Sequence, residues 1–118
     1  MPDRDVSGFL GLPATAFHIL VSLADGDRHG YAIMREVAER TGGKLKLNAG
    51  TLYTTIKRLL SNGLIAELGE RPDVGKDDER RRYYCLTPFG RKVVRAEAAR
   101  LEDLLSMARK AGLVPKRA

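Results

Sequence analysis

The sequence predicts a mainly α-helical fold with a small two-stranded β-ribbon before the last helix. Three observations support this prediction. Four segments repeat apolar residues at helical spacing, glycine and proline mark the ends of these segments, and two strand-like stretches flank one polar loop. The 118 residues, 43% of them hydrophobic, can bury the core of one ordinary domain and are too few for two.

A flexible leader is expected over residues 1–12, followed by the first helix. Pro13 lies near the start of that helix, where proline is tolerated because its missing N–H is not needed for helical hydrogen bonding. The apolar residues spaced to share one buried face are Phe17, Leu20, Leu23 and Ala24. The segment DGDRHG, residues 25–30, then predicts a turn, since aspartate and glycine favour turn conformations.

The second helix follows this turn and ends at a pair of glycines. Ile33 and Val37 are spaced to face the core. The charged residues expected on its outer face are Arg35, Glu36, Glu39 and Arg40. Gly42 and Gly43 come next, and glycine readily adopts the left-handed conformation found just past a helix end.

Residues 48–63 predict a third helix with no acidic residue. The side chain of Asn48 can cap its first turn, and Gly63 ends it. Its buried stripe consists of Leu52, Ile56, Leu59 and Leu60. The opposite face carries Gly50, Thr54, Lys57, Arg58 and Ser61, with Tyr53 on the flank. Such a face can approach a DNA groove closely and donate hydrogen bonds to it, whereas an ordinary solvated helix face usually carries glutamates as well.

A ribbon and a fourth helix complete the predicted fold. The strand-like stretches are residues 64–70 and 80–87, separated by a polar loop over residues 71–79. Thr87 and Pro88 then predict the start of a helix that runs to about Lys110. Three helices followed by a ribbon form the winged helix-turn-helix plan, in which the third helix is free to enter a DNA major groove.

The charge of the chain favours an anionic partner. Its formal net charge is +6 and its pI is about 9.8, and nucleic acid is the commonest partner of such proteins. The charge is unevenly distributed. Residues 1–30 contain two basic and four acidic residues, whereas residues 85–118 contain eight basic and three acidic ones.

Other function classes find no support in the sequence. It contains no nucleophile–histidine–acid set, no glycine-rich phosphate loop and no metal-ligand spacing among His18, His29 and Cys85, so neither an enzyme nor a cofactor is expected. A lone cysteine fits the reducing cytoplasm. We expect no membrane span and no secretory signal, because the apolar runs are far shorter than the roughly 20 residues that a span needs.

Four motifs, in this order and spacing, resemble the PadR family of transcriptional regulators. They are HGYAI (29–33), GTLYTTIKRL (50–59), NGLI (62–65) and RRRYYCLTPFG (80–90). The resemblance covers about residues 13–110. It implies a winged-helix DNA-binding domain over residues 13–86 and a C-terminal helix and tail over residues 87–118 that form a homodimer. It also implies a repressor whose affinity for DNA can be lowered by a small molecule.

The predicted DNA contacts lie on the third helix and the ribbon. They are Asn48, Gly50, Thr51, Tyr53, Thr54, Lys57, Arg58, Ser61, Lys76, Arg80 and Arg82. The hydroxyl of Tyr53 can donate to a phosphate or can cover the edge of the core, and the resemblance favours the phosphate. The sequence leaves open which cations of the ribbon contact DNA, because its loop also carries Asp73, Asp77, Asp78 and Glu79.

The last helix carries a candidate subunit seam. Its apolar residues are spaced 4, 3, 4 and 3 apart, as in a coiled coil: Val94, Ala98, Leu101, Leu105 and Ala108, with Leu104 beside them. The same face could instead cover its own domain. A lone helix that leaves a small domain has little core left to cover, and the resemblance supports a homodimer.

These features together predict a sequence-specific regulator that binds duplex DNA as a homodimer, with the third helix in the major groove. The alternatives are a winged helix that binds proteins, which would favour an acidic or apolar exposed face, and one that binds RNA. The resemblance also implies a flat aromatic effector held between the subunits. The chain has no tryptophan, so stacking on such a ligand would fall to Phe9, Phe17, Phe89 or a tyrosine, and no ligand residue is assigned.

Overall fold

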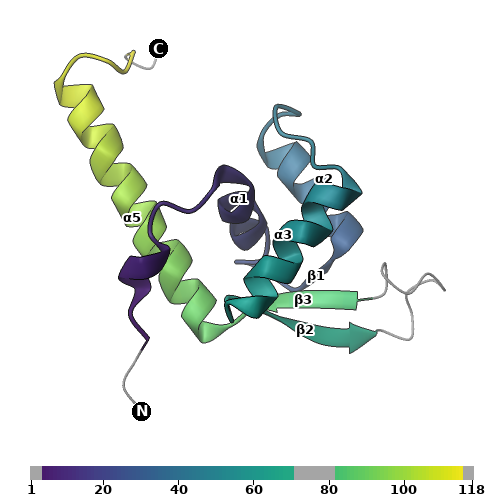
Figure 1. The fold of residues 1–118 in the computed structure, drawn as a ribbon. Coiled ribbons are helices and arrows are strands. Elements are labelled where there is room, and N and C mark those ends of the chain that lie inside the picture. The colour runs from purple at the N-terminus through teal and green to yellow at the C-terminus, as the bar shows by residue number, and fades with distance from the viewer. Residues whose placement is uncertain (1–3, 71–81, 116–118) are drawn as a thin grey trace.

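The computed structural model describes residues 4–70 and 82–115 and contains the predicted order of elements (Figure 1). A 3-10 helix, η1, precedes three helices, a ribbon and a long last helix. The bounds are η1 Val6–Phe9, α1 Ala14–Ser22, β1 Arg28–His29, α2 Gly30–Arg40, α3 Ala49–Ser61, β2 Ile65–Glu70, β3 Arg82–Leu86 and α5 Pro88–Lys110. This confirms the predicted fold class, a mainly helical winged helix-turn-helix with a long last helix.

One hydrophobic core joins α1, α2 and α3 to the ribbon and to the first turns of α5. Its fully buried residues include Ile19, Leu20, Ile33, Leu52 and Val93. They come from helices that each carry one apolar stripe, so packing the stripes together removes them from water. Ala24, which we expected on the buried face of the first helix, lies beyond the end of α1 and is exposed.

The sheet has three strands in the order β1-β3-β2, all antiparallel, where the sequence predicted two. The extra strand lies within the predicted turn over residues 25–30: Arg28 pairs with Tyr84 and His29 with Tyr83. Two residues are too few to show strand alternation, and their partner lies more than fifty positions away. Only the folded chain brings the two segments together.

The predicted helix ends are confirmed by specific hydrogen bonds. Asn48 Oδ1 accepts from the N–H of Thr51 at 2.8 Å, which caps α3. Thr87 Oγ1 accepts from the N–H of Gly90 at 2.9 Å and donates to the carbonyl of Gly63 at 2.6 Å, so it caps α5 and ties it to the end of α3. Gly63 has a φ of +73°, the left-handed conformation expected past a helix end.

The N-terminal segment from Arg4 to Leu12 packs against α5, in contrast to the flexible leader predicted for residues 1–12. The Arg4 guanidinium lies 4.0 Å from the centre of the Phe89 ring, and its Nη1 donates to the carbonyl of Asn62 at 3.0 Å. Phe9 meets Phe89 edge to face, with ring centres 5.5 Å apart. This packing could not be predicted from apolar periodicity, because the segment forms no helix or strand long enough to show a repeat.

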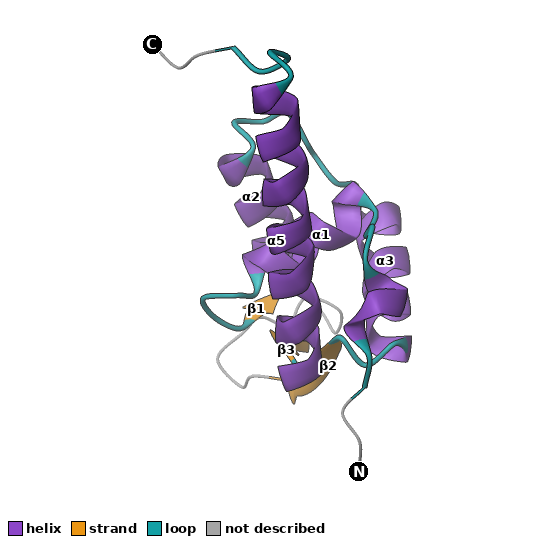
Figure 2. Ribbon diagram, turned by 90° about the vertical axis from the view of Figure 1, so that its left-hand side faces the viewer, coloured by secondary structure: helices purple, strands orange, loops and turns teal. Residues whose placement is uncertain are grey.

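The long helix α5 has two different halves. Gly90, Val93, Val94 and Glu97 in its first half are buried in the domain. Its second half extends beyond the other helices, as Figures 1 and 2 show from two sides. None of the helices in the described part of the chain is long and apolar enough to cross a membrane.

Candidate nucleic-acid interface

The outward face of α3 is a continuous polar surface. Leu52, Ile56 and Leu59 are at most 3% exposed and fix the helix against the core. The predicted contact residues on the other side are exposed: Asn48, Gly50, Thr51, Thr54, Lys57, Arg58 and Ser61. In Figure 2, α3 lies at the right-hand edge of the molecule, with the other helices on one side of it only. This face can therefore meet a large partner.

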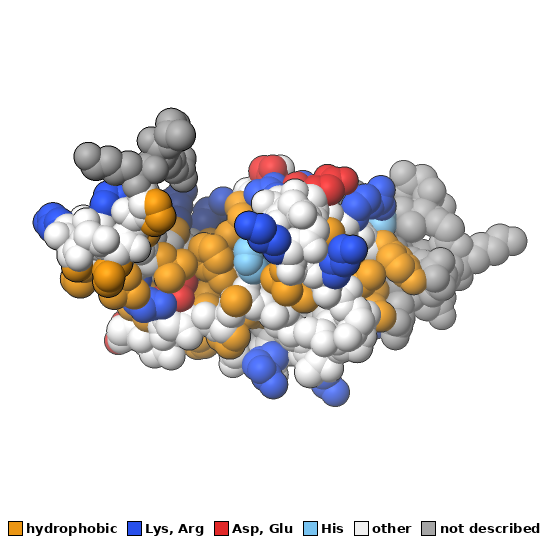
Figure 3. All heavy atoms as spheres, turned by 90° about the horizontal axis from the view of Figure 1, so that it is seen from above, with side chains coloured by type: hydrophobic (Ala, Val, Ile, Leu, Met, Phe, Trp, Pro, Cys, Tyr) orange, Lys and Arg blue, Asp and Glu red, His pale blue; other side chains and the backbone are white. Residues whose placement is uncertain are grey.

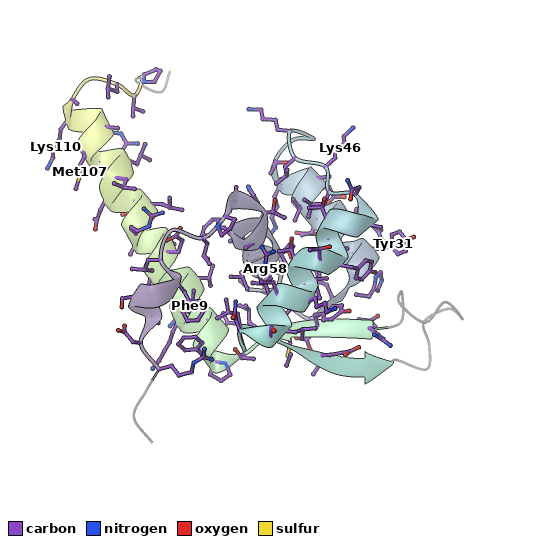
Figure 4. The ribbon with its side chains drawn as sticks, in the orientation of Figure 1. Phe9, Tyr31, Lys46, Arg58, Met107 and Lys110 are labelled. Atoms are coloured by element: carbon purple, nitrogen blue, oxygen red, sulfur yellow. The ribbon has the colours of Figure 1, made fainter. Side chains whose placement is uncertain are left out.

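The charge of this face is entirely positive. Lys57 and Arg58 form no ion pair or hydrogen bond with any residue that the structure describes. Arg58 also lines a cavity of about 250 Å³ between α3 and the N-terminal segment, together with Phe9 and Leu12; its position on α3 is shown in Figure 4. A phosphate that approaches α3 thus meets two cations that no carboxylate of the described residues pairs with.

Tyr53 lies on the flank of this face and packs inward. Its side chain is half-buried against the core. A Cβ atom placed on Gly30 would collide with the Tyr53 hydroxyl, so the absence of a side chain at Gly30 allows the tyrosine to reach the start of α2. The Tyr53 ring thus packs at the edge of the core, and the predicted contact of its hydroxyl with a phosphate stays a prediction.

His29 caps the start of α2. Its Nδ1 accepts from the N–H of Ala32 at 3.2 Å, and its ring meets Tyr83 edge to face. Burial, with a smaller contribution from the nearby Arg35, lowers the pKa of His29 and favours the neutral ring that accepts this hydrogen bond.

Among the DNA contacts predicted for the ribbon, Arg82 is the one that lies within the described residues. Arg82 Nε lies 3.2 Å from Glu67 Oε1, so its charge is already engaged by the neighbouring strand. Lys76 and Arg80, the other contacts predicted for the ribbon, lie outside the described residues.

The second half of α5 carries a row of exposed apolar side chains. Leu101, Leu104 and Leu105 are 39%, 45% and 43% exposed. Ala98 and Ala108 lie on the same helix and complete the predicted seam. Val94 is different: it is 7% exposed and belongs to the core of its own chain, so its position in the seam was wrongly predicted. Over a single heptad, the apolar spacing of a helix that pairs with a second subunit is the same as that of a helix that packs on its own domain.

Sequence reasoning missed the buried carboxylate of Glu97. It is 1% exposed and accepts four hydrogen bonds: from the N–H groups of Gly11 and Leu12 at 2.9 Å each, and from Arg100 Nε and Nη2 at 2.7 and 2.9 Å. The hydrogen bonds from Arg100 contribute most to lowering the pKa of Glu97 from 4.5 to about 2. A glutamate within an apolar stripe, three residues after Val94, is the sequence feature that could have indicated it.

The sequence and the fold have known relatives. The Transcriptional regulator PadR-like family matches residues 19–96. A transcriptional regulator of Mycobacterium tuberculosis is 36% identical over 91 residues, which are 77% of this chain and 78% of that protein. A protein encoded in a Streptomyces fradiae transposon is 38% identical over 96 residues and 81% of this chain, which spans only 24% of that protein's length.

Solved structures share the fold. A transcriptional regulator from Clostridium thermocellum has a TM-score of 0.67 at 29% identity, with 80% of this chain and 89% of the other covered. PadR of Bacillus subtilis, in a structure with operator DNA, has a TM-score of 0.61 at 21% identity, with 71% and 46% covered. At that identity the second likeness concerns the fold alone.

Three helices, an antiparallel ribbon and an exposed third helix define a winged helix-turn-helix protein. The chain belongs to the PadR-like family of transcriptional regulators. The resemblance found in the sequence motifs is thereby confirmed, and the family to which the chain belongs is one of transcriptional regulators, as expected.

Proposed function

We propose that the protein is a sequence-specific regulator that binds duplex DNA as a homodimer and places α3 in the major groove. The observation that carries this proposal is the face of α3, which is exposed along its whole length and has no acidic residue. Its two cations, Lys57 and Arg58, have no ion pair with any described residue. A groove lined by phosphates favours such a face. The Bacillus subtilis structure with operator DNA supports the proposal through its shared fold.

The N-terminal end of α3 is suited to read bases. Gly50 and Thr54 lie near this end and have short side chains, so the backbone can approach the base edges closely. Lys57 and Arg58 have longer side chains, which can reach outward to the phosphates on either side. The partial positive charge at the start of the helix adds to the attraction. We assign the recognition of sequence to Thr54 and the positioning on the backbone mainly to Lys57.

The homodimer rests on the exposed leucines of α5. Three neighbouring leucines on one helix are each about 40% exposed, and a second copy of α5 would remove this apolar row from water. Figure 3, a view from above, shows hydrophobic side chains at the left-hand end of the molecule, where α5 projects. Two copies would hold two α3 helices at a fixed spacing, as two DNA half-sites require.

We further propose that the bound protein represses transcription and that an aromatic effector releases it. A groove of about 350 Å³ lies between α1 and α5 and is lined by residues that include Phe17, His18 and Leu101. It adjoins the exposed leucines, so in a dimer it would open onto the subunit seam. An effector held there could change the angle between the two subunits and hence the spacing of the α3 helices.

A DNA-binding titration tests the proposal. A preferred duplex is first selected from a randomised pool, and fluorescence anisotropy is then measured at three salt concentrations with this duplex, a scrambled duplex and a duplex RNA. We expect tighter binding to the selected DNA and a log–log salt slope of about −0.9 per phosphate contact. A flat salt dependence, or equal affinity for RNA, would refute DNA recognition by α3.

Light scattering on the free protein provides the matching measurement of mass. We expect the mass of two chains. A reporter gene placed behind the selected sequence then tests repression directly: its expression should fall when the protein is produced and recover if an effector is added.

A further inference from the structure

Most basic residues in the described ranges fall into two groups. One group is paired with carboxylates: Arg28 and Arg40 bind Asp25 and Glu36, Arg82 binds Glu67, and Arg100 binds Glu97. The other group has no ion pair or hydrogen bond to any residue in the described ranges. Besides Lys57 and Arg58 on α3, this second group contains Arg35, Lys44, Lys46, Arg95, Arg109 and Lys110.

Arg35 and Lys46 of the unpaired group line one shallow groove. The groove lies between α2 and the turn that leads into α3, and its other lining residues are Tyr31, Met34, Ala38 and Leu47. Tyr31 is 38% exposed. Two cations and a tyrosine thus surround a small apolar floor, and none of the described residues that line this groove is acidic.

The two edges of α2 have opposite character. At about 100° per residue, Tyr31 and Arg35 lie on the edge near the turn, whereas Glu36 and Arg40 lie on the far edge. Glu39 lies between the two edges. In the centre of Figure 3, acidic side chains gather along the upper edge of the view, and separate basic side chains project from its middle and its lower edge. Pairing with Arg28 and Arg40 therefore holds the carboxylate of Glu36 on the edge away from the groove.

The groove has a fixed place beside the start of α3. Leu47 is 9% exposed and anchors the turn in the core. The hydroxyl oxygen of Thr41 accepts from the N–H of Leu45 at 3.0 Å, which shapes the turn from its other end. Lys46 then stands two residues before the cap Asn48. Figure 4 shows Lys46 and Tyr31 near the end of α3 where this cap lies, with Arg58 farther along the helix.

We infer that this groove, through Tyr31, Arg35 and Lys46, grips the phosphate backbone that flanks the major groove entered by α3. The inference rests on the proposed DNA binding and adds a second contact surface to it. In helix-turn-helix proteins the helix before the recognition helix crosses the DNA backbone, and unpaired cations around a groove match the anionic oxygens of a phosphate strand. Contacts of this kind hold the register of the protein and carry no sequence information themselves.

A charge-matched pair of double variants tests the inference. Arg35→Gln/Lys46→Gln removes the two cations of the groove, and glutamine keeps the helix propensity of α2 close to that of arginine. The control Arg109→Gln/Lys110→Gln also removes one unpaired arginine and one unpaired lysine, at the far end of α5. Anisotropy titrations with the selected and the scrambled duplex are made over the same salt series as for the unchanged protein.

The groove variant should show a salt slope shallower by about two, one for each lost phosphate contact. Its affinity should fall by the same factor for both duplexes, so that the ratio of the two affinities stays unchanged. The control should keep the slope of the unchanged protein. A groove variant with an unchanged slope, or a control that changes as much, overturns the inference while the proposed function stands. Failure of the unchanged protein to bind DNA would remove the proposed function itself.

Discussion

Replacing Glu97 by glutamine tests how strongly the N-terminal segment is held on α5. The carboxylate accepts four hydrogen bonds, two from backbone N–H groups and two from Arg100. Glutamine has one acceptor oxygen and presents an NH2 group where the carboxylate had its second oxygen. At least one of the buried donors therefore loses its partner, and the guanidinium loses its counter-charge.

The lowered pKa of Glu97 gives the size of the expected loss of stability. A fall from 4.5 to about 2 corresponds to about 3 kcal/mol of preference for the ionised form in the folded protein, since one pKa unit equals about 1.36 kcal/mol. The folded pKa is lowered, so this stabilisation is present above pH 4.5 and is lost as the pH falls towards 2. Glu97→Gln should therefore lower the free energy of unfolding by about 3 kcal/mol at pH 7 and by about 1 kcal/mol at pH 3.

Urea unfolding followed by circular dichroism measures both values, at one fixed protein concentration because a dimer is stabilised by mass action. The matched control is Glu102→Gln, an exposed glutamate on the same helix that has no ion pair or hydrogen bond with a described residue. It should change stability by less than about 0.5 kcal/mol at either pH. Equal effects of the two substitutions at pH 7, or a loss for Glu97→Gln that does not shrink at low pH, would refute the reasoning.

Three further outcomes follow from the structure. Thr54→Ala should weaken binding to the selected duplex by roughly 1–3 kcal/mol and leave scrambled DNA nearly unaffected, whereas Lys57→Ala should weaken both and make the salt slope shallower by about one. Equal losses for Thr54→Ala on both duplexes would make it a backbone contact. Leu101→Asp with Leu105→Asp should give monomers in light scattering, because the seam would bury repelling charges; a mass that stays dimeric places the interface elsewhere. Gly90→Ala should destabilise the protein by about 1–3 kcal/mol or more in thermal melts, because its Cβ would collide with the Leu64 carbonyl, and an unchanged melt would contradict this close packing.

The helices and their ends could be predicted from local sequence. Asn48 and Thr87 cap the helices that they were predicted to cap, and Gly63 adopts the predicted left-handed conformation. These features depend on neighbouring residues, because a helix needs apolar residues every third or fourth position and partners for the N–H groups of its first turn. The exposed basic face of α3 follows from the same periodicity, so the centre of the candidate site was visible as well.

The contacts between distant segments could not be predicted in this way. The pairing of β1 with β3, the packing of Tyr53 over Gly30 and the hydrogen bonds from Gly11 and Leu12 to Glu97 each join residues far apart in the chain. Such contacts leave no local periodicity.

The sequence by itself therefore determined the order of the helices, the ribbon and the polar face that α3 presents. Only the tertiary structure decided which charges are free to meet a partner. Arg28 and Arg40 are as basic in sequence as Arg35 and Lys46, yet folding sets the first two against the carboxylates of Asp25 and Glu36. The physical reason is that charges pair only within a few ångströms of each other. The packing of α1, α2 and the turns between them decides which charged side chains come that close.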